Sequence, residues 1–235
     1  MVSSALAGST NSYATAITIL LCIPASFLLI RKTHPDVAND HRKLSSLFLG
    51  FVVFSLVSFG VILTLRAFGL SIARHQALIF FMPAWSLWAS SYLNTDRLRE
   101  LDALGVILPF LVSIIRLYCF SQGCCYGLEI CTEPHLRVPI RELTIIWNSV
   151  TGLILLNEFE SEHVGGTVLS KYLISYSCMR LIEIALWGEP NRDPYLIEKI
   201  IAIGLFVFGI CLTWELEDED RGAYRVKNSG DRKRH

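Results

Sequence analysis

Charged residues are scarce in this chain. Only 18% of its 235 residues are Asp, Glu, Lys or Arg, whereas 52% are hydrophobic, and the mean hydropathy is +0.46. Such an apolar composition excludes an ordinary soluble domain and predicts a polytopic membrane protein. The net charge is zero, because 21 basic residues balance 21 acidic ones, so the composition gives no sign of a nucleic-acid partner.

Three further patterns are missing. No obvious internal repeat is present, which disfavours a transporter built from two similar halves. No C-x2-C pair occurs among the seven cysteines, so a zinc site is disfavoured, and we expect neither a metal nor a cofactor. No clear signal-peptide cleavage site precedes the first apolar run, so we expect Met1–Tyr13 to be a retained N-terminal segment.

Long apolar runs are what the sequence does contain. Spans of about 20 apolar residues, the length that crosses a membrane, recur about seven times. We expect them near Ala14–Ile30, Leu47–Leu65, Gln76–Leu93, Ala103–Phe120, Leu143–Leu156, Val168–Trp187 and Leu196–Trp214. The predicted fold is therefore all-α, with a single transmembrane helical domain at residues 1–215. Residues 216–235 form a charged tail that has little to pack, and we expect it to be disordered.

Basic residues predict the orientation of these spans. They gather after the first span, after the third span and in the tail, and Lys171 stands at the start of the sixth span. The positive-inside rule then places the N-terminus outside and the C-terminus in the cytoplasm.

Three charged residues stand out within the predicted spans, where each costs about 2.5–3.5 kcal/mol to insert at a helix centre. Arg116 belongs to the fourth span, and Arg180 and Glu183 belong to the sixth. The predicted orientation brings both arginines to a similar depth toward the outer face. Because a guanidinium fork suits phosphate oxygens, we interpret them as a site for a lipid phosphate, with Glu183 orienting Arg180. The alternative is that Arg180 only pairs with Glu183 while Arg116 extends to the interface.

Two other features lie on the same predicted side. His75 stands at the start of the third span, and histidine is the usual proton-transfer group near neutral pH. Cys119, Cys124, Cys125 and Cys131 form a C-x4-C-C-x5-C cluster. A disulfide between Cys131 and Cys124 or Cys125 is one interpretation of the cluster, and a role in the lipid site or as a reactive thiol is another.

The stretch that begins at Arg116 carries the most specific motif. It reads R-L-Y-C-F-S-Q-G-C-C-Y-G and ends at Gly127. Its arginine and its C-F-x-x-G-C-C-Y-G run resemble the cysteine-containing branch of the prolipoprotein diacylglyceryl transferase family. Asp102, the run R-V-P-I-R-E-L and the run Y-S-C-M-R-L-I-E-I-A-L-W-G-E-P flank it in the order that the family has. The resemblance therefore covers roughly His75–Pro190.

The resemblance implies an enzyme of the bacterial plasma (inner) membrane whose active site faces outward. Members move the diacylglyceryl group of phosphatidylglycerol to the cysteine thiol of a lipobox prolipoprotein, and glycerol phosphate leaves. On this sequence the resemblance implies His75 as base or proton relay, with Arg116 and Arg180 as catalytic cations. The residues expected to bind substrate are Gln122, Gly123, Tyr126, Gly127, Glu142 and Glu183.

Other functions stay open on the sequence. A divergent relative with another acceptor would keep the phospholipid donor. A membrane thiol-disulfide oxidoreductase would use the outer cysteine cluster, but it gives Arg116 and Arg180 no role. A non-enzymatic seven-helix receptor is a third possibility, although a retinal protein needs a lysine deep in its last helix and Lys199 lies near the start of that span.

Overall fold

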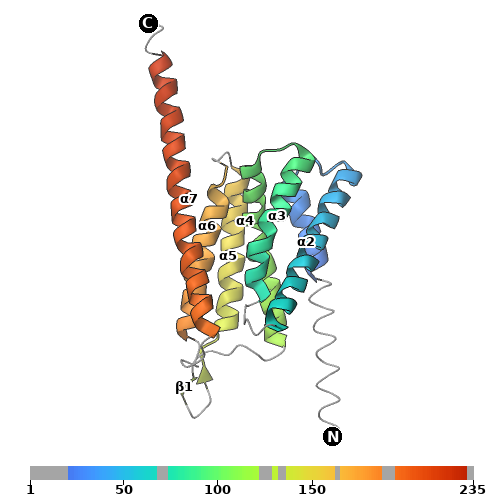
Figure 1. Ribbon diagram of the computed structural model, residues 1–235, viewed down its shortest axis with the longest axis vertical. Coiled ribbons are helices and arrows are strands. Elements are labelled where there is room, and N and C mark those ends of the chain that lie inside the picture. The colour runs from blue at the N-terminus through green and yellow to red at the C-terminus, as the bar shows by residue number, and fades with distance from the viewer. Residues whose placement is uncertain are drawn as a thin grey trace.

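Long helices account for almost all of the described chain. The computed structural model describes residues 21–67, 74–121, 129–131, 136–161, 165–186 and 194–231. Within them, helices of similar direction lie side by side in a bundle, and α7 projects beyond the others toward the C-terminus (Figure 1). The prediction of an all-α fold is confirmed for these residues, apart from two very short strands.

The elements follow one another up and down the bundle. A helical segment at residues 21–33 comes first. The helices that follow are α2 (His41–Ala67), α3 (Arg74–Leu93), α4 (Arg97–Ser121), α5 (Ile140–Glu160), α6 (Thr167–Leu186) and α7 (Pro194–Asp231). Between α4 and α5, strands β1 (Glu129–Cys131) and β2 (Leu136–Arg137) pair antiparallel.

Each predicted span from the second to the seventh overlaps one of these helices. Most of the helices are longer than the predicted apolar runs, and α5 shows why. The sequence predicts a short fifth span, whereas α5 has 21 residues. Its last turn holds Glu158 and Glu160. These two acids end the apolar run from which the span was predicted, but the helix continues through them. Glu158 pairs with Lys171 on α6, and Glu160 pairs with Lys32 at 2.8 Å. Ion pairs with neighbouring elements therefore extend α5 beyond its apolar part.

Helix α7 continues through the charged segment to Asp231. Disorder was expected from residue 216 onward. Glu217 and Arg221 in this segment are four residues apart, a spacing at which opposite charges support a helix. The separation of residues 216–235 as a cytoplasmic tail stays a prediction.

One helical stretch among the described residues, Glu198–Leu216, is long and apolar enough to cross a membrane by length and composition. It lies in α7 at one side of the bundle, against α6 (Figure 1). The other predicted spans stay predictions as membrane crossings. In α4 and α6 the apolar run is interrupted by the ionised side chains described below.

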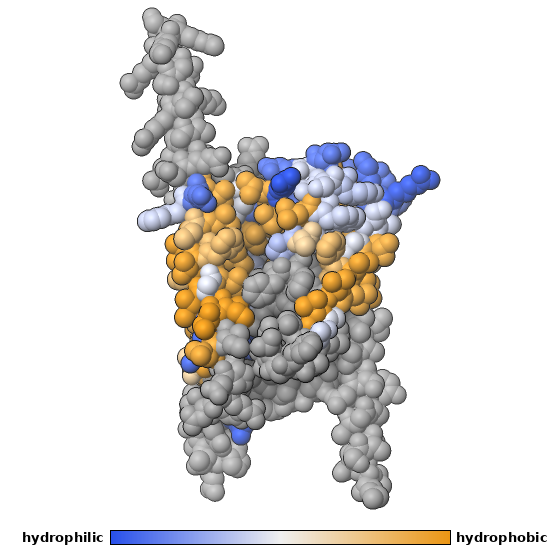
Figure 2. All heavy atoms as spheres, in the orientation of Figure 1, coloured by the Kyte–Doolittle hydropathy of each residue, from blue (hydrophilic) through white to orange (hydrophobic). Residues whose placement is uncertain are grey.

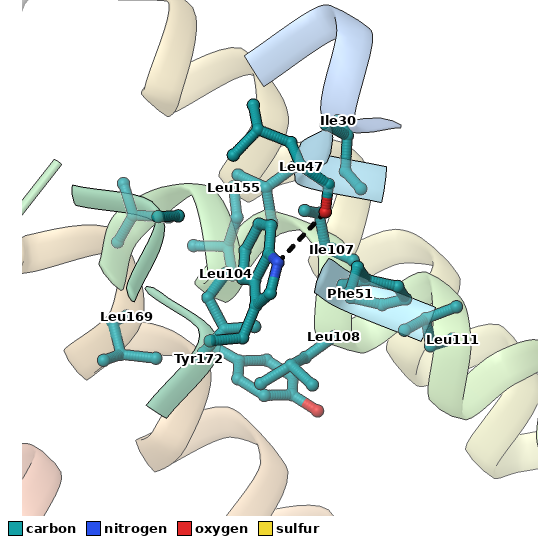
Figure 3. Packing of buried hydrophobic residues seen from close by; sticks show 14 of the residues in the cluster. Ile30, Leu47, Phe51, Leu104, Ile107, Leu108, Leu111, Leu155, Leu169 and Tyr172 are labelled. Carbon is teal, nitrogen blue, oxygen red and sulfur yellow. Dashed lines mark hydrogen bonds between the residues drawn. The ribbon is translucent and has the colours of Figure 1, made fainter. Parts of the chain in front are cut away.

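The hydrophobic core surrounds Trp85 of α3, which is fully buried. Its Nε1 donates a hydrogen bond to the carbonyl of Leu47 on α2 at 3.2 Å, and its ring meets Phe51 edge to face at a centroid distance of 5.4 Å. Leu104 of α4 and Tyr172 of α6 lie around the same ring (Figure 3). Trp85 therefore joins α2 and α3 to the α4–α6 side of the bundle.

Hydrophobic side chains cover much of the outside. Figure 2 shows them along the flanks, with hydrophilic residues gathered at the end that carries the α3–α4 connection. On α5 and α7 the exposed apolar residues are Leu143, Ile146, Trp147, Val150, Leu153, Ile154, Leu196, Ile200, Ile203, Val207, Phe208, Ile210 and Trp214. Exposed apolar surface of this extent marks a partner or a membrane.

Asp102 of α4 fixes the beginning of α6. Its Oδ2 accepts a hydrogen bond from the amide of Gly166 at 2.7 Å, and its Oδ1 accepts one from the amide of Leu169 at 2.9 Å. Gly166 directly precedes α6 and Leu169 lies in its first turn, where the amides have no intrahelical acceptors. One turn along α4, Gly105 lies so close to α6 that a Cβ there would come within 2.8 Å of the Leu169 Cα. The two helices are therefore in direct backbone contact.

We predict that Asp102→Ala destabilises the protein far more than removal of an exposed helix cap. The change leaves two buried amides without their acceptor, at about 1–3 kcal/mol each. The matched control is Asp40→Ala, because Asp40 accepts from the amides of Arg42 and Lys43 in an exposed first turn, where a cap contributes about 1 kcal/mol. Thermal unfolding in detergent gives the midpoint temperature of each variant. Equal shifts of the midpoint for Asp102→Ala and Asp40→Ala would contradict the role of Asp102 as a buried cap of α6.

Candidate functional site

The two arginines singled out in the sequence converge on one carboxylate. Arg116 of α4 donates from Nη2 to both oxygens of Glu183 on α6, at 2.7 Å each. Arg180, one turn before Glu183, donates from Nη1 to Glu183 Oε2 at 2.5 Å. The three residues are buried, with exposed fractions of 4%, 2% and 2% for Arg116, Arg180 and Glu183. Glu183 thus joins two helices through a shared ion pair.

Two further side chains complete this arrangement from neighbouring helices. Thr144 in the first turns of α5 donates its hydroxyl hydrogen bond to Glu183 Oε1. Glu198 in the first turns of α7 accepts a hydrogen bond from Nη2 of Arg180. We refer to Arg116, Arg180, Glu183 and Glu198 as the ion cluster. Four helices, α4 to α7, therefore meet at this point.

Local sequence explains how the ion cluster forms. Arg180 and Glu183 are three residues apart, which places their side chains on one face of α6. Arg116 lies near the C-terminal end of α4, the helix that packs against both α5 and α6. A buried arginine without a counter-ion costs several kcal/mol, so helices that carry one must meet where a carboxylate is available. The pairing of charge therefore selects how α4 and α6 pack.

The charges of the ion cluster cancel, because two guanidinium groups face two carboxylates. Buried pairs of this kind are stable only when the hydrogen-bonding atoms are also satisfied. The Arg116 Nε is buried and has no hydrogen-bond partner among the described residues. The charges of the cluster therefore balance, while the Arg116 Nε stays a donor that the described part of the chain does not use.

Glu142 lies near the ion cluster in the sequence but has a different neighbour. It belongs to the first turn of α5, and its Oε1 accepts from Arg141 Nη2 at 3.3 Å. Its Oε2 is buried without a hydrogen-bond partner in the described part of the chain. Thr144, two residues later, is the α5 side chain that contacts Glu183.

The remaining predicted site residues fall where the structure gives no side-chain description. His75 is the second residue of α3, and its side chain lies outside the described part. Gln122, Gly123, Tyr126 and Gly127 belong to residues 122–128, which the structure does not describe. Because α4 ends at Ser121, this segment follows directly after the helix that carries Arg116. Their roles stay predictions, as does the pairing of the cysteine cluster.

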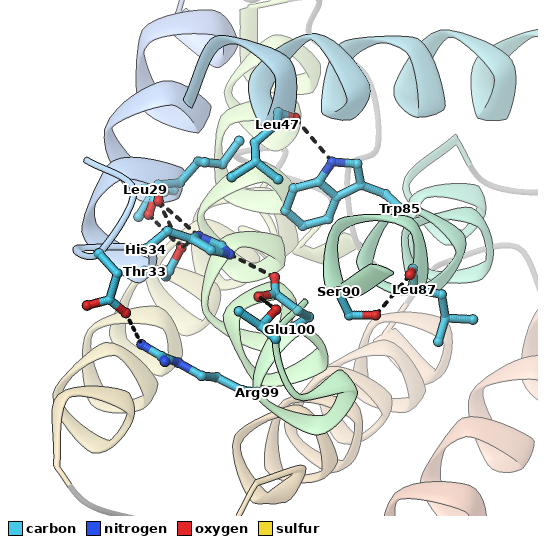
Figure 4. A network of polar contacts seen from close by, with 12 residues as sticks. Leu29, Thr33, His34, Leu47, Trp85, Leu87, Ser90, Arg99 and Glu100 are labelled. Atoms are coloured by element: carbon cyan, nitrogen blue, oxygen red, sulfur yellow. Dashed lines mark hydrogen bonds and ion pairs between the residues drawn. The ribbon is translucent and has the colours of Figure 1, made fainter. Parts of the chain in front are cut away.

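A second polar network lies toward the other end of α4 (Figure 4). Glu100 Oε2 lies 2.7 Å from His34 Nε2, and Glu100 Oε1 accepts a hydrogen bond from Thr95 at 2.7 Å. Arg99 pairs with Asp36 nearby at 3.4 Å. Glu100 precedes Arg116 by 16 residues on one helix, which corresponds to roughly 24 Å. This network therefore belongs to the opposite end of the bundle.

A cavity of about 420 Å³ opens at that same end. Its lining residues are Asp96, Arg99, Asp102, Phe159, Glu160, Ser161 and Gly165. Carboxylates dominate this lining, and Asp102 already serves α6 as a cap. Such a cavity is unsuited to an anionic ligand, so the ion cluster, not the cavity, is the candidate site.

Sequence reasoning missed Thr144 and Glu198. Thr144 has no distinguishing signal, because a threonine on an apolar helix is common. Glu198 carried the same signal as Glu183, an acid within an apolar span, and such acids usually pair with a cation at the same depth. Its partner lies on another helix, so no local spacing indicates it.

Comparison with known proteins identifies the family. The family model described as prolipoprotein diacylglyceryl transferase matches residues 16–215. The chain belongs to this family. The matched range contains the whole ion cluster and Thr144, and it confirms the resemblance that the motif at Arg116 predicts.

A curated relative matches part of the chain. The phosphatidylglycerol–prolipoprotein diacylglyceryl transferase of Clostridium tetani (strain Massachusetts / E88) is 28% identical over 138 residues. The match covers 50% of this chain and 55% of the relative, so the chain spans just over half the length of the curated relative.

We predict that Thr144→Val weakens the fold more than Thr151→Val does, although both changes remove a hydroxyl from α5. Thr144 donates to a buried carboxylate, an interaction of about 1.5–3 kcal/mol. Thr151 exchanges a hydrogen bond with the hydroxyl of Ser175 at 3.1 Å, and hydrogen bonds between membrane helices average about 0.6 kcal/mol. Thermal unfolding in detergent compares them, and a larger loss from Thr151→Val would contradict the ranking.

Proposed function

We propose that the protein is a membrane transferase that moves the diacylglyceryl group of phosphatidylglycerol to the cysteine thiol of a lipobox prolipoprotein. One observation carries this proposal: two buried arginines from different helices meet at a single anion, in a chain of this family. A lipid phosphate is an anion that reaches such a position from a membrane. Guanidinium groups match its oxygens in geometry as well as in charge.

The proposed reaction is a displacement at the carbon of the diacylglyceryl group. The thiol sulfur forms a bond to that carbon, and the bond from the carbon to the phosphate oxygen breaks. The electron pair stays on the oxygen of glycerol phosphate, and the thiol proton passes to His75. Negative charge grows on the departing phosphate, so cations fixed beside it lower the barrier. Arg116 and Arg180 are the proposed cations.

Residues near the end of α4 are proposed to bind the head group. Gln122 and Tyr126 would hydrogen-bond its hydroxyls, while Gly123 and Gly127 would let the backbone approach it closely. Glu142 is also a proposed substrate-binding residue, because it lies in the first turn of α5. No cofactor is required by this chemistry, because the arginines supply the positive charge.

We further propose that the bundle spans the inner membrane several times, with the N-terminus outside, the C-terminus in the cytoplasm and the site toward the outer face. Support comes from the exposed apolar flanks, from the hydrophilic end with the α3–α4 connection, and from the basic residues in the loops expected inside. Protease treatment of sealed cells should leave the tail after residue 215 intact, and cleavage of that tail from outside would reverse the assigned side.

We predict that Arg116→Lys impairs transfer nearly as much as Arg116→Ala does. Lysine keeps the charge but loses the rigid donor fork. Loss of a donor to the developing charge costs about 3 kcal/mol, or roughly a hundredfold in rate. Mass spectrometry of a lipobox peptide, after incubation with purified protein and phosphatidylglycerol, measures the rate and the release of glycerol phosphate.

The matched control is Arg99→Ala, because Arg99 is an exposed arginine near the opposite end of α4. This control should transfer at the wild-type rate. Wild-type rates from both Arg116 variants would contradict a phosphate role for Arg116. A wild-type protein that adds no diacylglyceryl group to the peptide would contradict the proposed function itself.

A further inference from the structure

The carboxylate of Glu183 occupies an anion-binding position built by three helices. Its Oε1 accepts from Arg116 and from Thr144, and its Oε2 accepts from Arg116 and Arg180. Guanidinium groups and a hydroxyl are also the donors that a phosphate group requires. In the protein without substrate, Glu183 therefore takes the place that we assign to the donor phosphate.

Glu198 is bound differently, because it contacts one arginine through a separate nitrogen. Arg180 uses Nη1 for Glu183 and Nη2 for Glu198. An anion that replaced Glu183 would leave the contact between Arg180 and Glu198 in place. Arg180 therefore has one contact that a ligand can exchange and one that α7 can keep.

Helix α7 is seated firmly enough to hold Glu198 in place. The buried side chains of its apolar part, Glu198, Ala202 and Leu216, recur on one face together with Gly209. A Cβ at Gly209 would lie 3.1 Å from the carbonyl oxygen of Ser170 on α6. Small residues thus bring the α7 backbone against α6, which fixes the distance from Glu198 to Arg180.

Arg116 offers an additional donor to an incoming anion. Its Nε is buried and without a hydrogen-bond partner among the described residues, while one nitrogen, Nη2, serves both oxygens of Glu183. Both oxygens of Glu183 also accept from Thr144 or Arg180, whereas a tetrahedral phosphate has further acceptor oxygens with which to engage Nε and Nη2 as a fork. Replacement of Glu183 by phosphate therefore gains a contact at Arg116.

We propose that the donor phosphate binds by displacing Glu183 from both arginines, while Glu198 acts as the positioning residue that keeps Arg180 directed at the site. This inference rests on the proposed function, because it names the change that the phosphate of that donor produces. Glu183 is then an internal competitor of the substrate, whereas Glu198 supports its binding.

The two carboxylates allow a sharp test, because Glu183→Gln and Glu198→Gln remove the same charge from the same cluster. Displacement predicts opposite effects: Glu183→Gln binds glycerol phosphate about tenfold more tightly, and Glu198→Gln binds it about tenfold more weakly, each near 1.4 kcal/mol. Isothermal titration calorimetry of the purified full-length protein in detergent measures its affinity for glycerol phosphate. A parallel titration with phosphatidylglycerol in mixed micelles tests the lipid as the source of the phosphate.

Matched variants separate positioning from folding. Glu215→Gln makes the same change at an exposed position of α7 and should leave binding unchanged. Glu198→Asp keeps the charge but shortens the side chain, so it should bind more tightly than Glu198→Gln and less tightly than the wild type, and KM in the transfer assay should follow the same order. If Glu183→Gln does not fold, Glu183→Asp takes its place, since a carboxylate shorter by one methylene group holds Arg116 less well and should also tighten binding.

The outcomes divide clearly. Tighter binding by both glutamine variants would mean that net charge alone governs affinity, and weaker binding by both would mean that both carboxylates only support the fold. Either result overturns the inference, as does a failure of the wild-type protein and Glu183→Gln to bind either ligand. Opposite effects without any transfer to a peptide would support the exchange but contradict the proposed function. Transfer to a peptide without opposite effects of the two variants would support the proposed function but contradict the exchange.

Discussion

The ion pairs of Glu183 are the interaction on which the arrangement of the bundle depends. A guanidinium buried at the position of Arg116 or Arg180 is tolerated only beside an anion, since breaking a buried pair costs about 3–5 kcal/mol. Glu183 serves both arginines, and it thereby requires α4 and α6 to meet at this height. Thr144 brings α5 to the same carboxylate, and Glu198 brings α7 to Arg180. Pairing of the buried charges thus requires α4, α5, α6 and α7 to pack together at this height.

The opposite end of the bundle keeps this arrangement in register. Asp102 caps α6 from α4, and Gly105 allows the two backbones to touch, so the helices cannot slide without loss of buried hydrogen bonds. The His34–Glu100 pair joins the segment at residues 21–33 to the same helix. Because α4 is fixed at this end, the exchange of partners that we propose for the ion cluster does not require α4 and α6 to move apart here.

The sequence predicts the helices well, because apolar length is a local property. It predicts α5 too short, because Glu158 and Glu160 gain partners from other elements. At the site, the spacing of three residues indicated the Arg180–Glu183 contact. The contact of Arg116 with the same carboxylate, and the part played by Glu198, depend on how α4, α6 and α7 pack. No pattern within a single helix contains that information.

The central claim is that a lipid phosphate takes the place of Glu183 between Arg116 and Arg180. An experimental structure of the purified protein with phosphatidylglycerol, determined beside one without added lipid, tests it most directly. The account predicts a phosphate within hydrogen-bonding distance of both guanidinium groups, a Glu183 carboxylate withdrawn from them, and an unchanged contact between Arg180 and Glu198. A lipid-loaded structure with both arginines still on Glu183 and the phosphate bound elsewhere would contradict it.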